Sequence, residues 1–86
     1  MQRGGDEKNI MPEGKLLEEL AAKAGCYISS LRDVSERERV FRILLETEPE
    51  RYELEEWEYT VSYITGKPVL FANYVEIRHF LWRNAG

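Results

Sequence analysis

The sequence predicts an all-α fold, a compact bundle of four main helices. Three observations indicate this: apolar residues recur at helical spacing, glycines stand where two of the segments end, and residues suited to capping precede two others. We expect helices over about residues 12–24, 36–46, 52–65 and 74–83, with a short element of uncertain type at 27–33.

The first predicted helix starts at Pro12, a residue suited to a first helical turn. Residues 1–11 are polar and offer almost nothing to bury, so we expect a disordered N-terminal segment followed by one globular domain over 12–86. Gly25 is a natural left-handed cap that ends the helix. Its apolar face consists of Leu16, Leu17, Leu20, Ala21 and Ala24.

The second predicted helix follows Cys26–Val34, a segment that fits a strand, a connector or a short helix equally well. Ser35 and Glu38 have the spacing of a capping box, in which each side chain bonds the other residue's backbone N–H. This predicts a helix that begins at Glu36, with an apolar face formed by Val40, Phe41, Leu44 and Leu45.

The stretch 52–66 allows two interpretations. As a helix it has one apolar stripe of Leu54, Trp57, Val61 and Ile64, and a tyrosine stripe on roughly the opposite side. The same residues alternate with period two, which allows a hairpin over 59–72 and an α+β fold. The stop signal of Gly66 and Pro68 favours the helix.

The last predicted helix has its own start signal. Asn73 and Glu76 repeat the capping pattern, and Ala72 and Ile77 occupy the positions of a hydrophobic staple. The core face is formed by Ile77, Phe80 and Leu81, while Val75, His79 and Trp82 lie on another side beside Arg78.

Length and composition restrict the function. A chain of 86 residues forms one modest core, and a net charge of -4 disfavours nonspecific binding to nucleic acid or anionic membranes. Cys26 is the only cysteine, so no internal disulfide forms, and no apolar run is long enough for a signal peptide or a membrane span. We therefore expect a cytoplasmic protein.

The chain is poor in residues that perform chemistry. One cysteine and one histidine do not make up a zinc site, and no calcium loop, phosphate loop or dinucleotide-binding motif is present. His79 is the only histidine that could activate a nucleophile, and nothing in the sequence places it near Cys26. We expect no enzymatic activity, no cofactor, no metal and no small-molecule substrate.

Protein recognition is the function that the residues favour. Residues 46–58 contain seven acids and one base, and tyrosine and tryptophan dominate binding hot spots. We expect a non-catalytic, regulatory protein–protein interaction module whose acidic and aromatic surface binds a protein partner or a second copy. The candidate residues are Tyr52, Glu55, Glu56, Tyr59, Tyr63 and Trp82.

Residues 20–34 resemble the helix-turn-helix of repressor-type DNA-binding domains. Ala21 stands at the small position and Gly25 in the turn, and Leu20, Ala24, Cys26, Leu31 and Val34 stand at the apolar positions. The resemblance implies that Tyr27–Asp33 is a recognition helix and that the protein is a DNA-binding regulator, the alternative function. The DNA contacts would then come from Tyr27, Ser29, Ser30 and Arg32.

Overall fold

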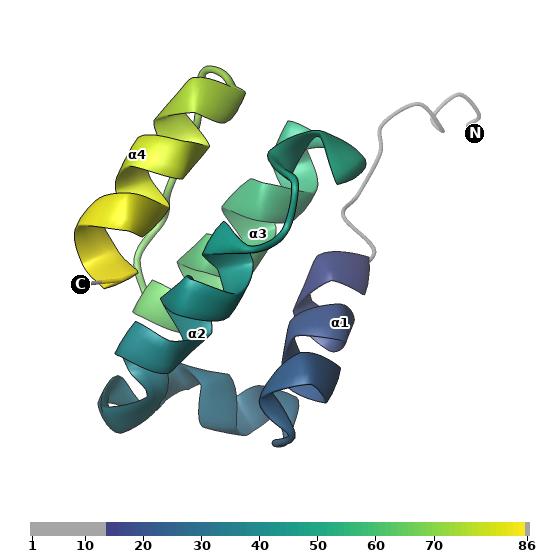
Figure 1. Ribbon diagram of the computed structural model, residues 1–86, viewed down its shortest axis with the longest axis vertical. Coiled ribbons are helices and arrows are strands. Elements are labelled where there is room, and N and C mark those ends of the chain that lie inside the picture. The colour runs from purple at the N-terminus through teal and green to yellow at the C-terminus, as the bar shows by residue number, and fades with distance from the viewer. Residues whose placement is uncertain (1–13, 86) are drawn as a thin grey trace, which may run out of the picture.

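The computed structural model describes residues 14–85, which form four α-helices and three short 3-10 helices (Figure 1). These residues contain no strand, so the predicted all-α fold is confirmed and the alternative hairpin over 59–72 is wrong. The expected N-terminal segment and the helix start at Pro12 lie outside the described residues. The elements are α1 (Lys15–Ala24), η2 (Ile28–Arg32), η3 (Val34–Glu36), α2 (Arg37–Leu45), η4 (Pro49–Arg51), α3 (Leu54–Thr65) and α4 (Tyr74–Ala85).

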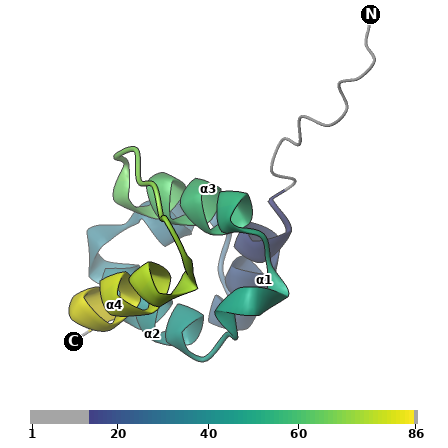
Figure 2. The same cartoon turned by 90° about the horizontal axis from the view of Figure 1, so that it is seen from above.

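Helices α1 and α4 lie on opposite sides of the molecule, with α2 and α3 between them (Figure 2). The most extensive helix pair is α2 with α4, and α1 packs against both α2 and α3. A long connection, residues 66–73, runs from the end of α3 back along the bundle to the first turn of α4. Helices α3 and α4 therefore run in the same direction (Figure 1). One face of α4 is therefore left at the edge of the bundle.

The core lies where the apolar faces of the four helices meet. Trp57 is its largest fully buried side chain, and its indole N–H donates to the Pro49 carbonyl at 2.8 Å. Burying the ring without that bond would leave the indole N–H unpaired in the core, so the bond fixes α3 against η4. The other fully buried apolar residues are Leu16, Leu20, Leu31, Val40, Phe41, Leu44, Val61, Ile64, Ile77 and Leu81.

Glycine ends two of the helices as expected. Gly25 after α1 and Gly66 after α3 have φ of 70° and 75°, the left-handed conformation that L side chains avoid. The N-cap of α4 is also confirmed, because Asn73 Oδ1 accepts from the Glu76 N–H at 3.0 Å. The Glu76 carboxylate reaches back to the Ala72 N–H at 2.8 Å.

The capping box expected at Ser35 does not form. Ser35 lies inside the 3-10 helix η3, whose Glu36 N–H donates to the Asp33 carbonyl, and α2 begins at Arg37 without a side-chain cap. An N-cap residue requires extended backbone, which a residue inside a 3-10 turn lacks. Glu38 instead forms an ion pair with Arg42 at 2.9 Å.

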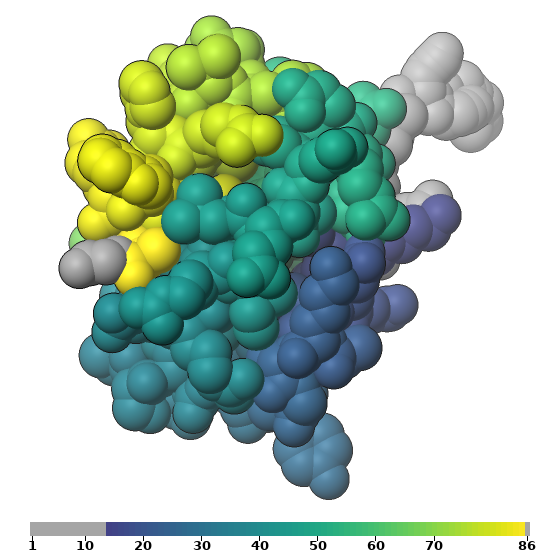
Figure 3. Space-filling view, viewed as in Figure 1, coloured from purple at the N-terminus to yellow at the C-terminus, as the bar shows by residue number. Residues whose placement is uncertain are grey.

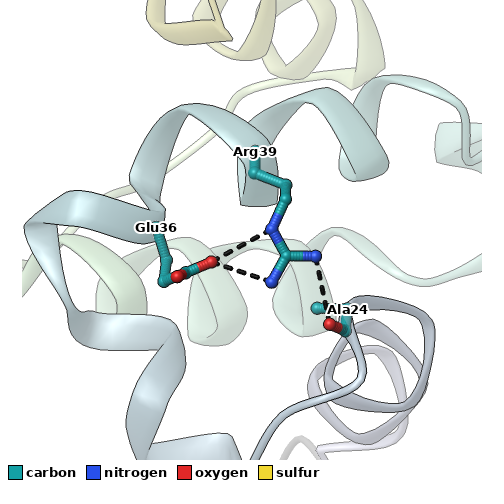
Figure 4. Close-up of polar contacts among 3 residues, drawn as sticks. All are labelled: Ala24, Glu36 and Arg39. Atoms are coloured by element: carbon teal, nitrogen blue, oxygen red, sulfur yellow. Dashed lines mark hydrogen bonds and ion pairs between the residues drawn. The ribbon is translucent and has the colours of Figure 1, made fainter.

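One arginine ties the end of α1 to the start of α2 (Figure 4). Arg39 donates to Glu36 Oε1 through two nitrogens, at 3.0 and 2.8 Å, and to the Ala24 carbonyl at 3.0 Å. That carbonyl belongs to the last turn of α1, where helix carbonyls lack partners and the helix dipole favours a cation. This contact connects α1 to α2 directly, across the segment that contains η2 and η3.

Candidate interaction surfaces

Tyr52, the first residue of the expected tyrosine stripe, is held by contacts within the chain. We expected Tyr52 on the helix, but it has an extended backbone and lies before α3. The 3-10 helix η4 ends just before Tyr52, and α3 begins only at Leu54. The Tyr52 hydroxyl donates to Glu19 on α1, and its carbonyl accepts from the Tyr74 hydroxyl at 2.8 Å. Tyr52 therefore joins α1, α3 and α4.

Glu56 and Tyr63 are also engaged by other parts of the chain. Glu56 is buried, and its Oε1 accepts from the Leu16 N–H at 3.5 Å. A carboxylate at the first turn of α1 stabilises unpaired N–H groups and the positive end of the helix dipole. Tyr63 is half-buried, and the Arg32 guanidinium lies 5.3 Å from its ring centroid.

Glu55 and Tyr59 remain open to solvent. They lie one turn apart on the outer side of α3, and Tyr59 is 45% exposed, with its ring edge beside Gly14. Within residues 14–85, Glu55 forms no ion pair. The same holds for four other exposed acids, Glu46, Glu48, Glu50 and Glu53.

Three of these acids converge on Tyr74 at the start of α4. Its pKa is raised above the ordinary value, first by burial and then by the negative charges of Glu53, Glu50 and Glu55. Each of these acids therefore lies near enough to the Tyr74 hydroxyl for its charge to act on it. We name Glu50, Glu53, Glu55 and Tyr59 the acidic tyrosine surface.

Trp82 lies on a second exposed surface, on the outer side of α4. It is 73% exposed, and Val75, two turns earlier, is 61% exposed. In the space-filling view α4 forms one edge of the molecule (Figure 3). Within residues 14–85, neither Arg78 nor Arg83 makes an ion pair or a side-chain hydrogen bond. We name Val75, Glu76, His79, Trp82 and Arg83 the α4 outer face.

A groove of about 490 Å³ borders the α4 outer face. Leu70 is 83% exposed at this groove, a position that periodicity did not reveal because the residue lies in an irregular connection. The backbone N–H of Phe71 donates to Glu58 at 2.9 Å, which fixes this connection against α3. The groove is lined by Pro68, Val69, Leu70, Phe71, Glu76, His79, Phe80 and Arg83.

The segment that resembles a recognition helix forms the five-residue 3-10 helix η2. Tyr27 and Ser29 are exposed, Ser30 is half-buried, and Leu31 is fully buried. The Arg32 side chain lies over Tyr63. A 3-10 helix of this length spans only about 10 Å, at a rise of about 2.0 Å per residue.

The part of the chain that the structure describes contains neither a cluster of metal ligands nor a bonded Cys26–His79 pair. No group of three or more His, Cys, Asp or Glu residues gathers there as for a metal ion. Cys26 is half-buried after α1 and His79 is exposed on α4, and no hydrogen bond joins them. None of the described helices is both long and apolar enough to span a membrane.

We compared the chain with known protein families, curated proteins and solved structures. None of them matches.

Proposed function

We propose that the protein is a non-catalytic, regulatory interaction module of the cytoplasm that binds a basic segment of a partner protein. The observation that carries the proposal is the acidic tyrosine surface. Its carboxylates have no ion pair within residues 14–85, and one of them, Glu55, lies one helical turn from the exposed Tyr59 ring.

The chemistry of this surface indicates the kind of partner. Lysine and arginine side chains would pair with Glu50, Glu53 and Glu55 and would be steered towards them by the local negative potential. The Tyr59 ring offers a large contact area at low entropic cost and a face for a cation. Tyr52, Glu56 and Tyr63 would support the surface from beneath, since internal contacts hold them.

Affinity capture from the native host tests this proposal. Wild type, Tyr59→Ala and Glu55→Lys serve as baits, with Val34→Ala as the matched control because Val34 is exposed on η3, outside the surface. We expect a basic protein that wild type and Val34→Ala retain and that the other two variants lose. Equal capture by all four baits would refute the proposed surface.

The same experiment addresses the alternative of DNA binding, which stays a prediction. Nucleic acid bound to each bait is measured alongside protein. If Arg32 contacts DNA, Arg32→Ala lowers the bound nucleic acid and weakens the salt dependence of binding, while Tyr59→Ala leaves both unchanged. Capture of nucleic acid with that pattern would favour the helix-turn-helix interpretation over the interaction module.

A further inference from the structure

Two rows of side chains run along the α4 outer face. Val75 and Trp82 form an apolar row, and Glu76 and Arg83 form a charged row beside it. The members of each row are seven residues apart, close to two helical turns, so each row follows the helix axis. His79 lies midway between the two ends, and all five side chains are exposed.

We propose that this face binds a second copy of the chain, with the two α4 helices antiparallel about a two-fold axis beside His79. In that arrangement Val75 of each copy meets Trp82 of the other, and Glu76 of each copy meets Arg83 of the other. Each apolar contact and each ion pair therefore forms twice, as a self-complementary two-fold interface requires.

The order of the charges selects this orientation. In a parallel pair related by a two-fold axis, the charged row of each copy would face the apolar row of the other. Glu76 and Arg83 would then be buried against apolar side chains without an opposite charge, which is unfavourable. Antiparallel helices place opposite charges together at both ends. Arg83 is available for the pair because its side chain has no hydrogen bond or ion pair within residues 14–85. Glu76 uses Oε1 for the Ala72 N–H, and its other carboxylate oxygen can accept from the arginine.

The apolar surface extends beyond the helix itself. The exposed Leu70 lines the groove together with His79 and Arg83. A second copy bound to α4 therefore also covers part of the 66–73 connection. The contact area remains small, and interfaces of this size give weak association. We expect a dissociation constant in the micromolar range.

This inference does not rest on the proposed function. The acidic tyrosine surface lies mainly on α3 and η4, whereas the dimer contact lies on the outer side of α4 and the 66–73 connection. A failure to capture a partner would therefore not count against the dimer. A protein that stays monomeric would not count against the proposed partner binding.

Sedimentation equilibrium of the full chain, from about 5 to 500 µM, measures the association. We expect a monomer–dimer equilibrium whose dissociation constant rises about tenfold or more in Trp82→Ala, because tryptophan is enriched among interface hot spots and this contact occurs twice. Val34→Ala, which removes exposed apolar surface elsewhere, should leave it unchanged. A wild type that stays monomeric throughout, or a dimer insensitive to Trp82→Ala, would overturn the proposal.

Charge reversal tests the pairing. Arg83→Glu and Glu76→Arg should each weaken the dimer about fivefold to tenfold, and the double variant should recover most of the loss. Glu18→Arg on α1, on the opposite side of the molecule, is the control with the same change in charge as Glu76→Arg. Circular dichroism confirms that each variant is folded. Failure of the double variant to recover would refute the antiparallel pairing.

Cysteine cross-linking provides an independent measure of the orientation, in a Cys26→Ser background. Position 79 lies beside its own copy in the proposed dimer, so His79→Cys should form a disulfide-linked dimer under mild oxidation. Two copies of position 75 lie about 12 Å apart along the axis, eight residues at about 1.5 Å each, too far for a disulfide. Cross-linking of Val75→Cys as efficient as that of His79→Cys would exclude the antiparallel arrangement.

Discussion

Thr60 is the polar side chain whose replacement should make this protein more stable. It is fully buried on the inner side of α3, and its hydroxyl oxygen has no hydrogen-bond partner. Thr65, on the same helix, donates its hydroxyl to the Val61 carbonyl at 2.9 Å, the usual contact of a helical threonine. Thr60 lacks the corresponding bond to the carbonyl four residues earlier.

The expected gain follows from the cost of burying an unpaired hydroxyl. Mutational data put that cost at about 1–3 kcal/mol. Thr60→Val keeps the branched shape and replaces the hydroxyl with a methyl group, so no cavity opens. We expect the free energy of unfolding to rise by about 1–2 kcal/mol, and for a domain of this size about 1 kcal/mol corresponds to roughly 4–8 °C in Tm.

Urea unfolding followed by far-UV circular dichroism measures the change, with thermal melts in parallel. Thr65→Val is the matched control: it removes a hydroxyl that is bonded, and should lower the free energy of unfolding by about 0.5–1.5 kcal/mol. If Thr60→Val lowers stability by as much as this control, the Thr60 hydroxyl has a partner and the argument fails. A higher midpoint with an unchanged m-value would support it.

Three further predictions concern the helix starts and Tyr74. Glu56→Ala should lower the free energy of unfolding by about 1–2 kcal/mol, and with it the Tm, because it removes the carboxylate that accepts from the Leu16 N–H. Glu55→Ala is the control and should leave Tm unchanged. Asn73→Ala should cost about 1 kcal/mol in urea unfolding, because the first turn of α4 loses its cap; no change would contradict that cap. The raised pKa of Tyr74 means that the folded protein favours the neutral phenol. The contribution of this effect to the free energy of unfolding is complete below the unfolded pKa of 10.0 and is lost as pH rises through the folded pKa. Tyr74→Phe should therefore lose less stability than wild type between about pH 9 and 11.

The sequence predicted the helix ends best where a single residue determines the backbone. Gly25 and Gly66 take the left-handed conformation, which glycine adopts without the steric cost that other residues incur. The two capping patterns had different outcomes because a cap also needs extended backbone at its first residue. Asn73 satisfies this requirement, whereas Ser35 lies within a 3-10 turn that the sequence pattern does not reveal.

The candidate surface was harder to predict because exposure depends on how the helices pack. The helical pattern correctly placed Trp57 and Ile64 in the core. Which residues beside that stripe stay exposed depends on where α1 packs, and α1 covers Glu56 while leaving Tyr59 open. Tyr52 was assigned to the helix face, but it precedes α3 because Pro49 begins a separate 3-10 helix. The burial of Glu56 depends on its contact with Leu16, 40 positions earlier, which local patterns do not contain.

Exposure alone does not identify an interaction surface, and the two proposals rest on more than exposure. Isolated apolar side chains such as Tyr27 and Val34 are normal on small proteins. The α4 outer face differs because its apolar and charged residues repeat at the same seven-residue spacing with opposite charges at the two ends. A dimer formed there would present two acidic tyrosine surfaces, so a partner with two basic segments would bind with an avidity about 10²–10⁴ above that of one site if its linker spans them. Trp82→Ala should then weaken binding of the two-site partner while leaving binding of a single basic segment unchanged.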